Sequence, residues 1–129
     1  MTDDFSTELG HPFTDAVDKV RTALAAEGFG ILTEIDITAT MQAKLGVGME
    51  DYLILGACNP SLAHRALEID RRVGQLMPCN VVVRDIGGGV LVEAMDPQLM
   101  VQFTGRPELG EVADEAAAKL RAAMAALKA

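Results

Sequence analysis

The sequence of 129 residues contains few aromatic and few basic side chains. It has no tryptophan, one tyrosine and four phenylalanines, so it offers little surface on which unpaired bases could stack. Lysine and arginine together number 11 against 19 aspartate and glutamate residues, which gives a net charge of −8. Binding to nucleic-acid phosphates or to an anionic membrane surface requires clustered basic side chains, and we therefore expect neither as a partner.

Long hydrophobic runs are also missing. The longest run, from Leu53 to Cys58, has the length of a strand and falls far short of the roughly 20 residues of a membrane-spanning helix. The segment 1–5 is acidic and lacks the basic and apolar regions of a signal peptide. We expect a cytoplasmic protein, in whose reducing surroundings the two cysteines, 21 positions apart, form no structural disulfide.

The composition is that of a folded protein. Half of the residues are hydrophobic and 23% are charged, which excludes intrinsic disorder. A chain of this length buries enough surface to fold without a metal or a disulfide. No linker, repeat or low-complexity segment divides it, so residues 1–129 are predicted to form a single domain.

The hydrophobic pattern predicts strands that alternate with helices. Strands are expected at 5–9, 29–37, 52–57, 81–86 and 90–92, and helices at 13–24 and 38–46 and after Pro60, Pro97 and Pro107. Thr38 is expected to cap the second helix, and the glycines at 87–89 to form a hairpin turn. The order β-α-β-α-β-α-β-β-α-α indicates a two-layer α+β fold with a mixed or mostly antiparallel sheet of about five strands.

Two strands are apolar on both of their faces. The segments 52–57 and 81–83 lack the alternation of a half-exposed strand. Such strands are covered on both sides, by helices or by another subunit. The pattern therefore predicts a homodimer.

The most distinctive feature is a pair of related tripeptides at the boundaries of these strands. Cys58-Asn59-Pro60 ends the first strand, and Pro78-Cys79-Asn80 begins the second. If the strands are neighbours, the two thiols lie close together at one end of the sheet. With Asn59 as cap, Cys58 would lie just outside a helix N-terminus, where free N–H groups favour a thiolate.

Several interpretations of this cluster remain open. Both cysteines can be small core side chains, with the asparagines as caps. Cys58 can be a reactive thiol, with Cys79 as partner and His64 or Asn80 polarising it. Cys58, Cys79 and His64 can bind a soft metal such as zinc or copper, although paired Cys-x-x-Cys spacing is absent. A pocket that binds a ligand without chemistry is the fourth interpretation.

Other polar and sulfur-containing residues have simpler readings. His64 and Arg65 precede Glu68 at helical spacing, which is typical of a solvated helix face, although an Arg and His anion site at a pocket edge is an alternative. The seven methionines, which include Met77, Met95, Met100 and Met124, are interpreted as adaptable core side chains rather than as a ligand cluster.

The same motifs resemble one protein family. The runs 55–60, 62–68 and 76–83, together with 28–36, 45–46 and 96–97, are similar to the signature of the "domain of unknown function 302" family. The likeness extends from about Phe5 to Leu127. It implies a small bacterial or archaeal protein with a compact α/β domain, which tends to be a homodimer and has no established activity or cofactor. The hallmark positions are Cys58, Asn59, Pro60, His64, Arg65, Pro78, Cys79 and Asn80.

The sequence thus leads to one main functional hypothesis and three alternatives. The main hypothesis is a homodimeric binding module for a small anionic or sulfur-containing ligand, with a pocket built from Cys58, Asn59, His64, Arg65, Cys79 and Asn80. The alternatives are a thiol-dependent enzyme with Cys58 as nucleophile, a soft-metal protein, and a structural or interaction subunit.

Overall fold

The computed structural model describes residues 4–128. Its strands are β1 (Ser6–Leu9), β2 (Gly30–Asp36), β3 (Tyr52–Cys58), β4 (Cys79–Asp85) and β5 (Val90–Ala94). Its helices are α1 (Phe13–Ala26), α2 (Ile37–Leu45), α3 (Pro60–Ile69), α4 (Leu99–Thr104) and α5 (Gly110–Lys128), with short 3₁₀ helices η1 (Arg71–Leu76) and η2 (Pro107–Leu109). The expected order of strands and α-helices is confirmed.

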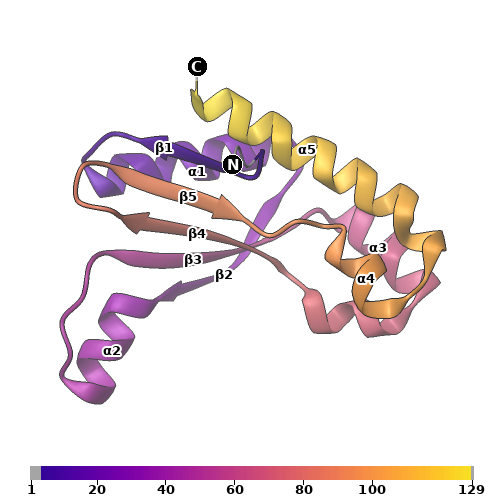
Figure 1. Cartoon of the computed structure of the whole chain (residues 1–129), viewed down its shortest axis with the longest axis horizontal. Helices are drawn as coiled ribbons and strands as arrows, with labels where there is room; N and C mark the ends of the chain where they lie inside the picture. Colours follow the sequence, from indigo (N-terminus) through magenta and orange to yellow (C-terminus); the bar gives the residue numbers. More distant parts are fainter. Residues whose placement is uncertain (1–3, 129) are drawn as a thin grey trace.

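The five strands form one antiparallel sheet in the order β1-β5-β4-β3-β2 (Figure 1). Strands β2 to β5 follow one another as a meander, and β1 completes the sheet beside β5. The glycines at 87–89 connect β4 to β5 as expected, and Gly87 has a φ of 90°, which favours glycine. The α+β class is therefore confirmed, and every strand pair is antiparallel.

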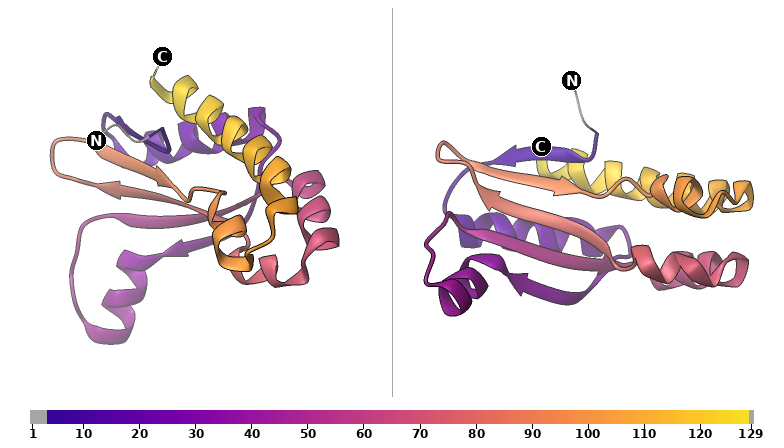
Figure 2. Two further views of the ribbon diagram at one scale, coloured as in Figure 1. Left: turned by 45° about the vertical axis from the view of Figure 1, so that its right-hand side comes forward. Right: turned by 60° about the horizontal axis from the view of Figure 1, so that its bottom comes forward.

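The core consists of two separate groups of buried side chains. The first, here called the sheet cluster, joins α1 and the C-terminal half of α5 to one face of the sheet through residues such as Leu24, Leu55 and Leu120. The second, the helical cluster, lies among α3, η1, α4, η2 and the N-terminal half of α5, and includes Leu62 and Val112. Figure 2 shows this second group of helices beyond one end of the sheet. Helix α5 belongs to both clusters.

The other face of the sheet is less protected. Leu53 and Leu55 of β3 are buried, whereas the alternate residues Tyr52 and Ile54 are only half-buried. On the edge strand β2, Ile35 is exposed. Within the described residues, this chain's own helices therefore leave the second face of β3 partly exposed, and cover of that face by another subunit stays a prediction.

Helix α2 begins with a different cap from the one expected. The Asp36 carboxylate accepts the Ala39 N–H at 2.9 Å and so caps the helix. The Thr38 hydroxyl instead donates to the Glu50 carbonyl at 2.6 Å and accepts the Tyr52 N–H at 2.9 Å. Thr38 thus ties α2 to the start of β3, and the prediction of a Thr38 cap was wrong. The helix ends before Gly46, as expected, with Gly46 in the left-handed conformation.

Within residues 4–128, no helix combines the length and the apolar character needed to cross a membrane.

Candidate functional site

The two cysteine-containing segments lie side by side at one end of the sheet. Strands β3 and β4 are antiparallel neighbours, and Cys79 is directly opposite Ala57 in their register. Cys58 is the next residue after Ala57, so the two cysteines occupy adjacent strands one position out of register. The predicted site required β3 and β4 to be neighbouring strands, and they are.

A cavity opens at this end of the sheet, between the sheet cluster and the helical cluster. Its volume is about 40 Å³. That is several times the roughly 10–15 Å³ needed by one water molecule, and far below the roughly 300–1,000 Å³ of pockets for drug-sized ligands. The lining consists of Phe29, Ala57, Cys58, Asn59, Leu62, Ala63, Ala66, Leu76, Met77, Pro78, Cys79, Met95, Pro97, Met100, Val112 and Ala116.

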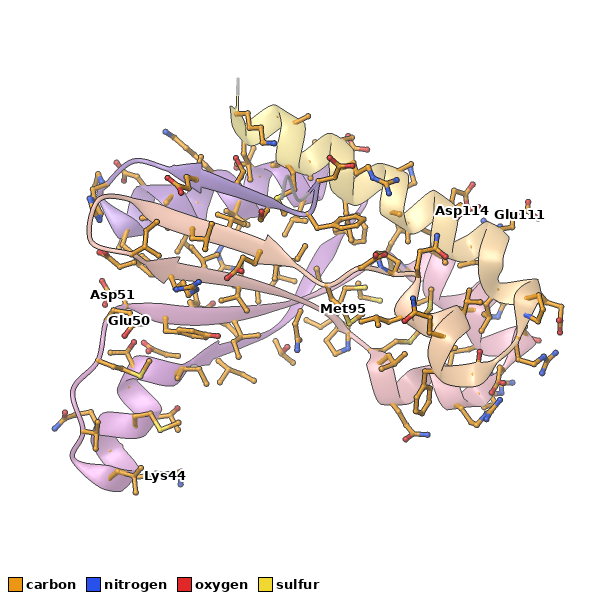
Figure 3. The ribbon with its side chains drawn as sticks, in the orientation of Figure 1. Lys44, Glu50, Asp51, Met95, Glu111 and Asp114 are labelled. Carbon is orange, nitrogen blue, oxygen red and sulfur yellow. The ribbon has the colours of Figure 1, made fainter. Side chains whose placement is uncertain are left out.

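Sulfur is the distinguishing element of this lining. Besides the two cysteines, Met77, Met95 and Met100 reach the cavity. The Met95 N–H donates to the Asn80 carbonyl at 3.1 Å, which places Met95 beside the start of β4. Because β5, β4 and β3 are consecutive in the sheet, three neighbouring strand ends each supply one sulfur-bearing residue. Figure 3 shows Met95 where the sheet meets the group of helices.

Gly56 allows the segment before Cys79 to approach the sheet closely. A Cβ at this position would lie 2.6 Å from Cγ of Pro78 and would overlap the Thr33 hydroxyl. Real Cβ atoms do not approach other heavy atoms so closely, and only glycine leaves room for the proline ring here. The packing of Pro78 on Gly56 fixes where Cys79 enters the sheet.

Asn59 connects the start of α3 to the turn between α1 and β2. It occupies the N-cap position and Pro60 the first turn, but the Asn59 side chain makes no capping hydrogen bond. Its Nδ2 donates instead to the Glu27 carbonyl at 3.3 Å. Gly28, with a φ of +85°, leaves space for this amide, which lies 3.1 Å from where a Cβ would be. Asn59 therefore positions α3 against the cavity.

Both thiols are free and half-buried. Burial raises the pKa of Cys79 to about 11, and the neighbouring Cys58 adds to this effect. Because the lining holds no basic side chain, nothing there stabilises a Cys79 thiolate. Cys79 is therefore a neutral thiol at neutral pH.

Three of the residues predicted for the site do not line the cavity. His64 is exposed, and its Nε2 lies 3.5 Å from Oε1 of Glu68. Arg65 pairs with Glu115 on α5. Asn80 is exposed and lies opposite Gly56 in the sheet register. The cavity therefore contains Cys58, Asn59 and Cys79 from the predicted set, but not the two candidate anion-binding side chains.

The structure does not assemble the expected metal trio. Within residues 4–128, no group of three or more His, Cys, Asp or Glu side chains is placed to hold a metal ion. The alternative of Cys58, Cys79 and His64 as three ligands fails because His64 faces solvent on α3. The sequence assigned the methionines to the core, and the structure confirms this for Met100 and Met124, which are buried, and for Met77, which packs against the helical cluster. Met100 and Met77 also line the cavity, together with Met95, which directly follows β5.

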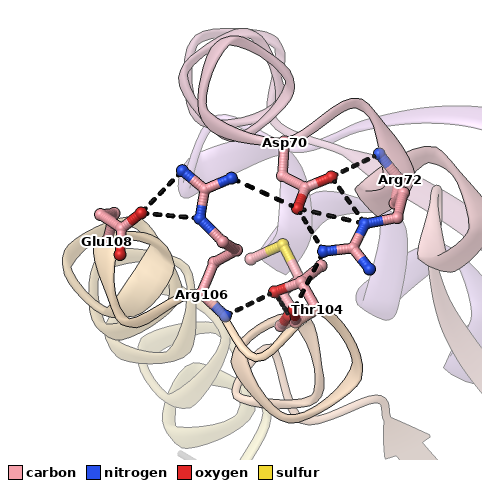
Figure 4. A network of polar contacts seen from close by, with 6 residues as sticks. Asp70, Arg72, Thr104, Arg106 and Glu108 are labelled. Atoms are coloured by element: carbon pink, nitrogen blue, oxygen red, sulfur yellow. Dashed lines mark hydrogen bonds and ion pairs between the residues drawn. The ribbon is translucent and has the colours of Figure 1, made fainter.

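A polar network holds the helices on the far side of the cavity together (Figure 4). The Asp70 carboxylate accepts hydrogen bonds from the Arg72 backbone at 2.9 Å and from its guanidinium at 2.7 Å. Arg72 also donates to the Thr104 carbonyl at 2.9 Å, and Arg106 lies 3.7 Å from Asp70. These hydrogen bonds to Arg72 lower the pKa of Asp70 to about 2. The network joins η1 to the end of α4.

Comparison with known proteins assigns the chain to a family. The family described as "Domain of unknown function DUF302" matches residues 5–127. The crystal structure of an uncharacterized conserved DUF302 protein from Bacillus stearothermophilus is similar, with 27% sequence identity and a TM-score of 0.87. That similarity covers 95% of this chain and 96% of the other. No curated protein matches the chain. With nearly its whole length matched, and with the fold shared, the chain belongs to the DUF302 family.

Proposed function

We propose that this protein is a binding module for a small, uncharged or soft ligand that enters the sulfur-lined cavity. The observation that carries the proposal is that two free cysteines and three methionines line one cavity. Sulfur is polarisable and interacts well with apolar and sulfur-containing groups. A ligand of a few non-hydrogen atoms matches the volume of about 40 Å³.

The lining favours a sulfur-containing ligand over an anion. Apart from the two thiols, Asn59 supplies the polar side chain of the lining, and it already donates to the Glu27 carbonyl. The nearby cations have carboxylate partners elsewhere, with Arg65 bound to Glu115 and Arg72 to Asp70. Moving an anion into an apolar cavity without a cation carries a large desolvation cost.

Nuclear magnetic resonance of methionine methyl groups tests this proposal. The protein, labelled with ¹³C at these methyls, is titrated with dimethyl sulfide and, separately, with acetate. We expect dimethyl sulfide to give saturable shifts at Met77, Met95 and Met100, while Met124, buried in the sheet cluster, does not move. Saturable shifts with acetate alone, or none with either probe, would contradict the proposal.

A cavity-filling variant provides the matched control. Ala63 lines the cavity, so the change Ala63→Leu should abolish the dimethyl sulfide shifts by occupying the space. Ala118 is exposed on α5, and Ala118→Leu adds the same atoms away from the cavity. Equal loss of binding in both variants would indicate a general effect on folding.

We further propose that the module is a homodimer that covers the surface formed by β2 and α2. This β2–α2 surface exposes Leu32, Ile35, Leu45 and Val47, and Leu45 is 70% exposed. Helix α2 has nine residues and no buried residue. Isolated helices below roughly 12–15 residues are marginal in water, so packing against a second copy would account for its stability. The strands that are apolar on both faces support the same assembly.

Light scattering coupled to size-exclusion chromatography tests the dimer. At micromolar concentration we expect a mass of twice the 13.7 kDa of one chain. The double change Leu32→Ser and Leu45→Ser should give the monomer mass. Ile86, exposed near the β4–β5 turn, provides the control Ile86→Ser, which should remain dimeric. A monomeric unmodified protein would overturn this proposal.

A further inference from the structure

We propose that the groove between α1 and the edge strand β2 binds an aliphatic polyamine, a chain of methylene groups that carries several ammonium groups. The groove lies at the opposite end of β3 from the sulfur-lined cavity, so this inference is independent of the function proposed for that cavity. Its volume is about 540 Å³, which falls within the roughly 300–1,000 Å³ of small-molecule sites. It therefore has room for a chain-like molecule.

The groove exists because α1 leaves one face of β2 uncovered. Strand β2 is at the edge of the sheet, and six of its seven residues are exposed. Asp36 lies opposite the buried Leu53 in the register and therefore projects from the same face of the sheet, the face on which α1 packs. Glu34, two residues earlier, projects from that face as well. Helix α1 thus forms one wall of the groove, and charged side chains of β2 form another.

Charged side chains on the inner face of an edge strand have a simpler explanation, which is to prevent edge-to-edge pairing. That explanation accounts for Glu34 and Asp36, which belong to β2. It does not account for Asp18 on α1 or for Asp51 just before β3, which line the same groove from its other walls. Carboxylates from three separate segments therefore surround one space, and this arrangement favours a cationic ligand.

The groove has an excess of negative charge. Four carboxylates line it, whereas Arg21 is the one basic side chain among its described lining residues. Arg21 forms an ion pair with Glu34, which connects α1 to β2 and leaves three acidic side chains. Asp36 uses one oxygen to cap α2. Within residues 4–128, the side chains of Asp18 and Asp51 form no hydrogen bond or ion pair, so both are available to a ligand.

The arrangement of the carboxylates favours an extended cation over a metal ion. Calcium requires six to eight oxygen ligands around one point. Within the described part of the chain, no group of three or more Asp, Glu, His or Cys side chains is placed to hold a metal ion. A polyamine carries its charges on separate nitrogen atoms, so each ammonium group can approach a different carboxylate.

The floor of the groove matches the methylene segments of such a ligand. Phe13 and Val17 of α1 line the groove together with Leu53 of β3. Methylene groups that cover these side chains remove apolar surface from water, which stabilises the complex. A hydrated inorganic cation gains nothing from an apolar floor. The floor therefore distinguishes a polyamine from the cations that the net charge of −8 attracts in general.

Isothermal titration calorimetry with spermidine, at an ionic strength of about 0.15 M, tests this inference. We expect saturable binding of one spermidine per chain, and Mg²⁺ at the same concentration should not displace it. Asp18→Asn and Asp51→Asn each remove one charge-assisted contact and should each weaken binding by about tenfold. Glu111→Gln removes the same charge from the exposed start of α5, far from Asp51 (Figure 3), and should change the affinity by less than about twofold.

Nuclear magnetic resonance of backbone amides locates the bound spermidine. We expect shifts at Val17 and Leu53 and none at Cys79, which lines the other cavity. Lack of saturable binding, displacement by Mg²⁺, equal losses in Asp51→Asn and Glu111→Gln, or shifts centred on Cys79 would each overturn the inference. Asp18 and Asp51 are both exposed, so either variant alone keeps the test valid. None of these outcomes alters the dimethyl sulfide test of the sulfur-lined cavity.

Discussion

The Arg72 guanidinium bridges Asp70 and Thr104, donating to the carboxylate at 2.7 Å and to the carbonyl at 2.9 Å. The Asp70 side chain is only 7% exposed. Replacing it by asparagine removes the charge that Arg72 and Arg106 share. We expect Asp70→Asn to lower the melting temperature measured by calorimetry. Glu68→Gln, which alters an exposed carboxylate on α3, should lower it much less, and equal effects would contradict this role for Asp70.

Acid should weaken the same network in a defined range. The pKa of Asp70 is about 2 in the folded chain, against an ordinary value of 3.8. The folded chain therefore binds fewer protons at this group, and its contribution is complete above pH about 4 and lost as the pH falls towards about 2. Urea unfolding across this range should show a smaller loss of stability in Asp70→Asn than in the unmodified protein. Parallel losses would show that other carboxylates dominate.

Gly56 is predicted to be intolerant of a side chain. Gly56→Ala would require both the Thr33 hydroxyl and the Pro78 ring to move, and overpacking of this kind costs about 1–3 kcal/mol in unfolding free energy. Gly48→Ala is the control, because a Cβ there meets nothing within 4 Å. Chemical denaturation measures both. A Gly56→Ala protein of unchanged stability would mean that Pro78 can move freely.

Cys79 should react slowly at neutral pH. With a pKa of about 11, only about one molecule in ten thousand carries the thiolate at pH 7. Its rate of alkylation by iodoacetamide, followed by peptide mass spectrometry, should rise about tenfold per pH unit to beyond pH 9. Circular dichroism must show that the fold persists. A rate that levels off below pH 9 would contradict the stated pKa.

His64 should not influence the reactivity of Cys58. Its side chain is 75% exposed and lies beside Glu68, away from the cavity. We therefore expect His64→Ala to leave the initial alkylation rate of Cys58 unchanged. Asn59→Ala serves as comparison, since Asn59 lines the cavity and should alter access to the thiol. A several-fold slower reaction in His64→Ala would support the alternative of a thiol enzyme assisted by this imidazole.

The sequence predicted the fold well because its signals were local. Apolar runs and the glycines at 87–89 depend on neighbouring residues, and they give the observed strands and turn. Among the prolines, Pro60 begins α3 as expected, whereas Pro107 begins the 3₁₀ helix η2 ahead of α5 and Pro97 lies two residues before α4. The cap of α2 was misassigned because Asp36 and Thr38 are both good caps, and only the approach of the Glu50 carbonyl to Thr38 decides between them.

The site was harder to predict because it depends on contacts across the chain. The tripeptides around Cys58 and Cys79 suggested a pair, and antiparallel register brings them together. Helical spacing predicted a solvated face with His64 near Glu68, and this is observed. Nothing local indicated that Arg65 would pair with Glu115, 50 positions away. The contribution of Met95 and Met100 depends on β5 and α4 meeting the end of β4, which no short motif encodes.

Helix α5 takes part in both hydrophobic clusters, with Val112 and Ala116 in one and Ala117 and Leu120 in the other. Residues up to Ala116 pack in the helical cluster and residues from Ala117 onward pack in the sheet cluster. Because α5 is one continuous helix, it fixes how the two clusters are rotated relative to each other about the helix axis. Each added residue turns a helix by about 100°. A single alanine inserted there would leave both clusters intact in composition and misalign them, deforming the walls of the cavity between them.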